Sequence, residues 1–283
     1  MGSQNHPLPI PSTHPRHSLP DFSYEEPCHS LPDLWRGYRK HFKKDMAINS
    51  LVKFWEDFVG PFGFHPLDNM DDIPFVEWVR HESDNYNYHF HKNFVPVPYV
   101  GNIEEARILV LMTNPGYAPS NYEEEHPPSL LVREELKTLR GQRSGQWCLD
   151  SQLSRTNGYS YWEPVWKQIA IDLTKDLPEI NMKKAYDLIS RYVAIVQLIP
   201  YHSKDARLTK RVLELESVQQ ARQWIIRDAL PTKDLIVVRR KRREWGLPES
   251  EKLVLDGVPR SKWLNRSEPE RIRTALRDII EIK

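Results

Sequence analysis

The chain has 283 residues with 40 lysines and arginines, 39 aspartates and glutamates and 39% hydrophobic residues, which is typical of a soluble globular protein. No stretch approaches the roughly 18 uninterrupted apolar residues of a membrane span, and the N-terminus lacks the basic and then apolar pattern of a secretion signal. We therefore expect a cytoplasmic protein without a membrane partner. Two cysteines, Cys28 and Cys148, are too few for a disulfide framework or a four-cysteine zinc site.

The net charge of +1 is an average over two unlike parts of the chain. Residues 1–200 carry 20 basic and 26 acidic side chains, a balance of −6, whereas residues 201–283 carry 20 basic and 13 acidic side chains, a balance of +7. A basic segment that forms one face can bind a polyanion even when the whole chain is nearly neutral. A solvated basic surface without a partner is the alternative interpretation.

The first third of the chain differs in composition from the rest. Residues 1–32 repeat proline, histidine and serine, a composition that predicts a disordered arm. Residues 33–94 are interpreted as a helical and aromatic N-terminal extension, because the apolar spacing from Leu34 to Phe58 is that of two amphipathic helices. Gly60, Pro61 and Gly63 end this pattern.

Residues 95–283 alternate short apolar runs with helical patterns. The runs, which predict buried strands, span residues 106–112, 193–199, 235–238 and 252–255. Helical periodicity is found at residues 129–140, 162–175, 217–230 and 268–282. This alternation predicts an α/β fold, with a three-layer αβα domain around a central, mainly parallel four-stranded sheet.

Polar side chains follow the predicted strands, namely Asn114, His202, Arg239 and Arg260. Ligands of such folds bind outside the C-terminal ends of the strands, so we expect a site there. The sequence lacks the glycine-rich dinucleotide turn, the P-loop and the G-x-S-x-G elbow, and we expect no cofactor. No metal site is predicted either, because the pair His89 and His91 has no evident third ligand.

One segment carries a resemblance to a known family. Residues 108–117, which end in Thr113-Asn114-Pro115-Gly116-Tyr117, resemble the first motif of the uracil-DNA glycosylase superfamily, and most closely its mismatch-specific branch. Residues 97–102 and 195–203, and Arg239 with Trp245, resemble a divergent bacterial branch of that superfamily. The chain departs from the family at two motifs. The His-Pro-Ser of the last strand is absent from residues 258–267, and Gln197 stands where several branches have asparagine.

The resemblance implies a monofunctional DNA glycosylase that flips a base out of DNA, hydrolyses its N-glycosidic bond and leaves an abasic site. Asn114 would orient the attacking water, and His202 or Arg260 would stabilise the departing base. The implied base pocket contains Thr113, Pro115, Gly116, Tyr117, Gln197, Tyr201, Ser203 and Asn265. The implied DNA contacts are Arg239, Arg240, Lys241, Arg242 and Arg243.

The departures from the family motifs point away from uracil and toward a modified base, with phage defence as the implied setting. Three alternatives stay open: a plain uracil-DNA glycosylase, a catalytically silent nucleic-acid-binding module on the same fold, and a nucleoside hydrolase or transferase. DNA is the expected partner, and a monomer is the favoured state.

Overall fold

The computed structural model describes residues 51–58, 60, 62–76, 86–126, 129–247, 254–256 and 267–281, all of which belong to one unit, residues 42–283. The predicted arm at residues 1–32 and the expected helical pattern before residue 51 lie outside the described residues. The helices are α2 (Leu51–Glu56), α3 (Asn121–Glu124), α4 (Leu130–Leu139), α5 (Asn157–Asp176), α6 (Met182–Tyr192), α7 (Lys210–Leu213), α8 (Glu216–Trp224), α9 (Arg242–Trp245) and α10 (Ser267–Glu281). Short 3₁₀ turns lie at Trp147–Leu149 and Ser151–Leu153, and a π-helical turn at Ile225–Ala229.

A five-stranded sheet with the order β3-β5-β4-β6-β7 forms the centre of the fold. Its strands are β3 (Tyr99–Val100), β4 (Ile108–Met112), β5 (Val193–Gln197), β6 (Leu235–Val238) and β7 (Val254–Asp256). Four strands are parallel, and β3 pairs antiparallel with β5 at one edge. The mixture of helix and sheet agrees with the predicted α/β class, but the sheet is five-stranded and mixed instead of four-stranded. A separate parallel pair joins β1 (Phe75–Val76) to β2 (Phe90–His91).

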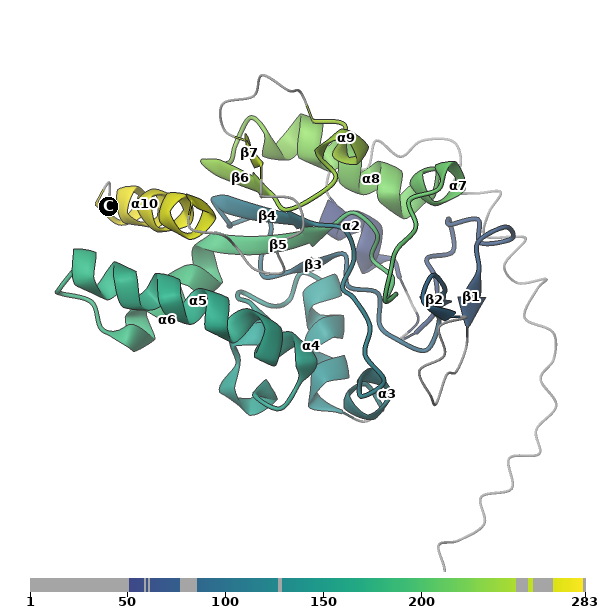
Figure 1. Cartoon of the computed structure of the whole chain (residues 1–283), viewed down its shortest axis with the longest axis horizontal. Helices are drawn as coiled ribbons and strands as arrows, with labels where there is room; N and C mark the ends of the chain where they lie inside the picture. The colour runs from purple at the N-terminus through teal and green to yellow at the C-terminus, as the bar shows by residue number, and fades with distance from the viewer. Residues whose placement is uncertain are drawn as a thin grey trace, which may run out of the picture. The chain divides into compact units, whose positions relative to one another are not determined.

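Helices cover both faces of this sheet (Figure 1). Successive side chains of a strand point to opposite faces, so Leu109 and Leu111 of β4 join one buried cluster while Ile108 and Val110 join another. The first cluster contains residues of α2 and α8, and the second contains residues of α5, α6 and α10. Because both faces are buried, the strands are apolar throughout and can be recognised as continuous runs in the sequence.

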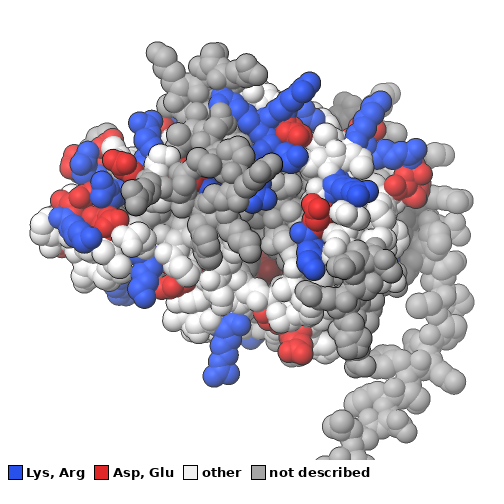
Figure 2. All heavy atoms as spheres, viewed as in Figure 1, with Lys and Arg blue, Asp and Glu red and all other residues white. Residues whose placement is uncertain are grey.

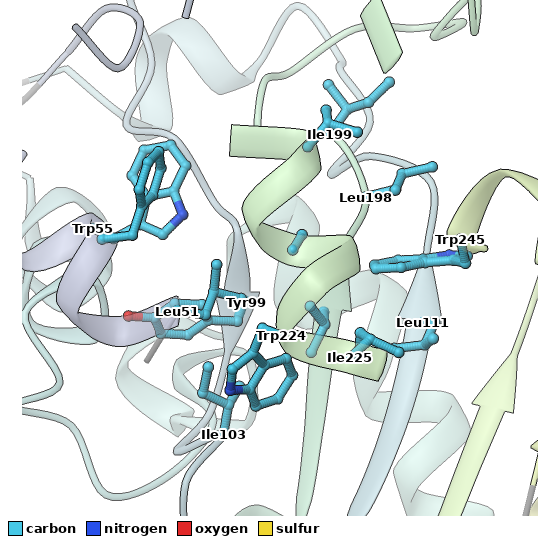
Figure 3. Packing of buried hydrophobic residues seen from close by; sticks show 14 of the residues in the cluster. Leu51, Trp55, Tyr99, Ile103, Leu111, Leu198, Ile199, Trp224, Ile225 and Trp245 are labelled. Atoms are coloured by element: carbon cyan, nitrogen blue, oxygen red, sulfur yellow. The ribbon is translucent and has the colours of Figure 1, made fainter. Parts of the chain in front are cut away.

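Large aromatic side chains fill the cluster on the α8 face (Figure 3). Trp245 of α9 lies beside Leu111 of β4 and Ile225, and is fully buried. Trp55 of α2 is buried in the same cluster as Tyr99 of β3. The described part of the predicted N-terminal extension therefore packs directly on the residues of the sheet domain.

A buried carboxylate joins this early segment to the end of β5. Asp68 accepts hydrogen bonds from the backbone N–H of Ser217 at 2.8 Å, from the Ser217 hydroxyl at 2.6 Å and from the Tyr201 hydroxyl. The Tyr201 hydroxyl in turn accepts from the backbone N–H of His65 at 2.9 Å. Burial raises the pKa of Asp68 to about 6, although the hydrogen bonds from Ser217 and Tyr201 lower it in part. These hydrogen bonds hold Tyr201, and with it the loop that follows β5, against the segment that contains His65 and Asp68.

Candidate functional site

A cavity of about 510 Å³ lies at the C-terminal ends of β4 and β5. These two strands are neighbours, but the chain after β4 reaches α5 and α6 on one face, while the chain after β5 reaches α7 and α8 on the other. Such a divergence of connections leaves a crevice between two loops, which is where open α/β sheets bind their ligands. The cavity has the size of a small-molecule site.

The cavity brings together six of the residues that the sequence predicts for the site. They are Asn114, Pro115, Gly116, Tyr117, Gln197 and His202. The walls are completed by residues of α3, α4, the Trp147 turn and the start of α5. The predicted residues Arg260 and Asn265 lie outside the described residues.

Three other predicted pocket residues act from outside the cavity. Thr113 contributes its carbonyl, which accepts from the Ile199 N–H at 2.9 Å. Tyr201 is not a pocket residue but a buried core residue that binds Asp68. Ser203 is buried as well, and its hydroxyl donates to the carbonyl of Asn87 at 3.2 Å. All three residues belong to the loops that follow β4 and β5, but they do not line the cavity.

The carboxamide of Asn114 is held in a defined orientation. Its Nδ2 donates to the carbonyl of Ser203 at 2.7 Å, across the gap between the loops that follow β4 and β5. Since a carbonyl only accepts, this contact assigns the amide and leaves Oδ1 as the acceptor of the group. Asn114 can therefore present an oxygen to a water or hydroxyl in the cavity.

His202 is a neutral ring in this site. Its Nδ1 donates to the carbonyl of Gly116 at 3.0 Å, which places the ring proton on Nδ1. Burial, with a contribution from His91, lowers the pKa of His202 to about 3. The Nε2 atom therefore carries a lone pair and lies 3.8 Å from Oε1 of Glu125. The expected role of His202 as a donor to the departing base is not available to a ring in this state, because its free nitrogen is an acceptor.

Two buried glutamates on the cavity wall were not predicted from the sequence. Glu125, after α3, and Glu135, on α4, are 2% and 3% exposed. Burial raises the pKa of Glu125 well above its usual range, although the Val95 N–H donates to its Oε2 at 3.2 Å. Burial also raises the pKa of Glu135, and the nearby charge of Glu125 raises it further. Burial therefore favours the protonated form of both carboxyls.

A signal for Glu135 does exist in the sequence. Leu131, Glu135 and Leu139 are spaced by four residues, which places them on one side of a helix. A glutamate on the apolar side of an amphipathic helix is buried unless the helix turns away from the core. Glu125 follows a four-residue helix, so no periodicity identifies it.

Several buried polar atoms of the wall have no hydrogen-bond partner among the residues that the structure describes. They are Glu125 Oε1, Glu135 Oε2, Gln197 Oε1, His202 Nε2 and Trp147 Nε1. Each such atom costs about 1–3 kcal/mol when it stays unmatched. These atoms belong to residues that line the cavity, but each has almost no accessible surface of its own.

Aromatic side chains supply the apolar part of the wall. The rings of Tyr117 and His91 stack with centroids 3.9 Å apart and an interplanar angle of 17°. Trp147 lies against Gly158 of α5, where an added Cβ would come within 2.5 Å of the indole. Gly158 is thus required for the indole to take its place. Flat walls of this kind suit a planar heterocycle.

The predicted basic run divides into a buried and an exposed part. Arg239 is buried, and its Nη1 is 2.6 Å from Oε2 of the fully buried Glu268 at the start of α10. Arg239 was expected to contact phosphate at the surface, but in the structure its guanidinium is buried and paired with the carboxylate of Glu268.

The rest of the run lies at the surface. Arg240, Lys241 and Arg243 are exposed and Arg242 is partly exposed, and Figure 2 shows lysine and arginine side chains gathered over α9. Tyr161 lines the cavity and is 37% exposed. Its partial burial raises the pKa of its hydroxyl, and the charges of Arg239 and Arg240 lower this pKa again in part. Of the exposed cations, Arg240 therefore lies within electrostatic reach of the cavity.

Among the described residues, no three side chains of the metal-binding types are grouped closely enough to hold an ion. His91 instead contacts the Tyr122 hydroxyl through Nδ1 at 3.1 Å. None of the helices in the described ranges is both long and apolar enough to span a bilayer.

Comparison of the chain with models of known families, with curated proteins and with solved structures found no match. Function is therefore inferred from the geometry of the cavity and its surroundings.

Proposed function

We propose that the protein is a monofunctional DNA glycosylase, which takes an extruded base into the cavity and hydrolyses its N-glycosidic bond. The observation that carries the proposal is the oriented carboxamide of Asn114 in a cavity that is also lined by the aromatic residues Tyr117, Trp147 and Trp162. A base is a planar ring with a polar edge, and both parts find a counterpart there. The exposed cations Arg240, Lys241 and Arg243 would contact phosphates beside the cavity.

In the proposed reaction, Asn114 Oδ1 accepts a hydrogen bond from a water and directs its oxygen to the anomeric carbon of the sugar. The new carbon–oxygen bond forms as the N-glycosidic bond breaks, and the base leaves with the bonding electron pair. Glu125, with its pKa raised by burial, donates a proton to the base, and the resulting carboxylate regains a proton from the attacking water.

The proposal is tested by incubating the purified full chain with oligonucleotides that contain uracil, mismatched or modified bases, followed by alkali to cleave abasic sites. We expect strand cleavage for at least one modified base, and a loss of about 100-fold or more in rate for Asn114→Ala, the range associated with positioned proton-transfer groups. Asn69→Ala, at an exposed position, is the matched control.

Two outcomes would contradict this assignment. Intact strands for every substrate would exclude the glycosylase, and salt-sensitive DNA binding without excision would favour the silent binding module instead. An Asn114→Ala variant that folds and excises as fast as the original chain would remove Asn114 from the mechanism.

A further inference from the structure

The carboxamide of Asn114, which lines the cavity, is in contact with a backbone carbonyl. Its Nδ2 atom is 2.7 Å from the carbonyl oxygen of Ser203. A backbone carbonyl only accepts hydrogen bonds, so the group that meets it must donate one. Asn114 fulfils this condition with an N–H, and its Oδ1 atom remains as the acceptor of the carboxamide.

The carbonyl of Ser203 cannot readily turn away from this contact. Ser203 is fully buried, and its hydroxyl donates to the carbonyl of Asn87 at 3.2 Å. The same carbonyl of Asn87 accepts from the N–H of Asp205 at 2.8 Å, which holds the chain just after Ser203 as well. The loops after β4 and β5 are also joined directly, since the N–H of Ile199 donates to the carbonyl of Thr113 at 2.9 Å. The acceptor at this position is therefore fixed.

A fixed acceptor at this distance discriminates between the side chains that could occupy position 114. A carboxylate would place a negatively charged oxygen against the carbonyl oxygen, and the two acceptors would repel each other. A protonated carboxyl can instead donate its O–H, because 2.7 Å is also an ordinary distance for an O–H···O hydrogen bond. A hydrogen bond that only the neutral form can make raises the pKa of an acid.

We infer that the carbonyl of Ser203 is a positioning group, which restricts position 114 to an uncharged side chain in a single orientation. The inference rests on the proposed function, because it concerns how Asn114 acts on the attacking water. Asn114 directs this water as a hydrogen-bond acceptor and takes no proton from it; in the proposed reaction that proton passes to the carboxylate of Glu125. The site therefore requires an amide, and a stronger base at the same position does not improve it.

The experiment exchanges the amide for a carboxyl of nearly the same shape in the purified full chain. In Asn114→Asp the pKa of the new carboxyl should lie above about 5, against about 3.9 for an unperturbed aspartate, which is a gain of more than about tenfold in proton affinity. The protonated carboxyl reproduces both the donor and the acceptor of the amide. The excision rate of this variant, divided by that of the original chain at the same pH, should therefore fall at least about tenfold from about pH 5 to about pH 8.

A second measurement does not depend on excision. As the pH rises, the unfolded chain of Asn114→Asp loses the new proton before the folded chain does, because only the folded chain offers it the carbonyl of Ser203. Urea titrations should therefore show that this variant loses unfolding free energy progressively from about pH 4 to about pH 7, relative to the original chain. Asn181→Asp is the matched control, because Asn181 is exposed and its Oδ1 accepts from the N–H of Lys184 at 2.9 Å, a contact that a carboxylate retains. The control should lose no unfolding free energy over this range.

A relative excision rate of Asn114→Asp that rises with pH, as a general base at this position would give, overturns the inference, and so does a rate that is independent of pH. A loss of unfolding free energy no larger than that of Asn181→Asp overturns it as well. If no base is excised by the original chain, the glycosylase is refuted and the urea titrations still decide the inference. If Asn114→Asp does not fold at any pH, NMR of the original chain decides it. The Nδ2 protons of Asn114, assigned by their absence from Asn114→Ala, should exchange with solvent at least about tenfold more slowly than those of Asn181, and equal exchange rates overturn the inference.

Discussion

The ion pair between Arg239 and Glu268 allows a quantitative test of whether Arg239 is held in the interior while the rest of the basic run lies at the surface. The side chains of both partners are almost completely buried, with 5% and 0% exposure, and their charged atoms are 2.6 Å apart. Removal of one partner from such a pair leaves a buried charge uncompensated, at a cost of about 3–5 kcal/mol. Glu268→Gln keeps the volume and removes the charge, so it should lower the free energy of unfolding by that amount. The melting temperature should then fall by about 6–10 °C for a chain of this size.

Urea and thermal unfolding followed by circular dichroism measure this effect. Replacement of both partners by apolar residues, Arg239→Met with Glu268→Leu, should recover most of the loss, because neither charge then remains in the interior. Glu244→Gln is the matched control, since Glu244 faces Lys241 at 3.7 Å in a pair that is open to solvent, and it should cost less than about 1 kcal/mol. If Glu268→Gln lowers the free energy of unfolding no more than this control does, the ion pair does not hold Arg239 in the interior. A contact between Arg239 and DNA would then be possible.

Other buried groups give three more tests. Burial raises the pKa of Asp68 from 3.8 to about 6, so the folded state holds this proton more tightly, and the contribution of Asp68 to unfolding free energy should fall by about 3 kcal/mol as the pH rises from about 4 to 7. Asp68→Asn should remove that part of the pH dependence in urea titrations, and an unchanged slope would contradict it. Nitrogen NMR should find His202 neutral with its proton on Nδ1 at about pH 6, whereas a charged ring would refute the assignment. Gly158→Ala should displace Trp147 and lower the free energy of unfolding by about 1–3 kcal/mol, with slower base excision in the oligonucleotide assay. Unaltered excision would show that the indole is not part of the site.

The strands β4, β5 and β6 could be predicted from the sequence because they are buried on both faces. β4, β5 and β6 coincide with continuous apolar runs, and so does the short β7. The edge strand β3 has two residues and follows Pro98, which leaves no run to recognise. Helix α6 was not predicted either, although Ala185 and Ile189 are spaced as one helical face.

Only those site residues could be predicted that lie just after a predicted strand in the sequence. Asn114 lies two residues after β4 and His202 five residues after β5, and parallel strands bring their C-terminal ends together. The acidic wall depends on how α3 and α4 pack over that edge, which no local pattern encodes for Glu125. The burial of Arg239 depends on Glu268, which is 29 residues further along the chain. The sequence shows a cationic run, but not that its first member is directed inward.

The hydrogen bonds of Asp68 limit where the chain can be divided. Asp68 binds Ser217, 149 residues away, and Tyr201, 133 residues away, and Tyr201 directly precedes His202. A fragment that begins at residue 95 would retain the whole five-stranded sheet but lose the carboxylate that holds the loop after β5. The orientation of His202 and the carbonyl of Ser203 that holds Asn114 would then depend on a loop without its anchor. We therefore expect that a fragment which keeps the cavity as it is in the full chain must begin before Asp68, well ahead of the first strand of the sheet.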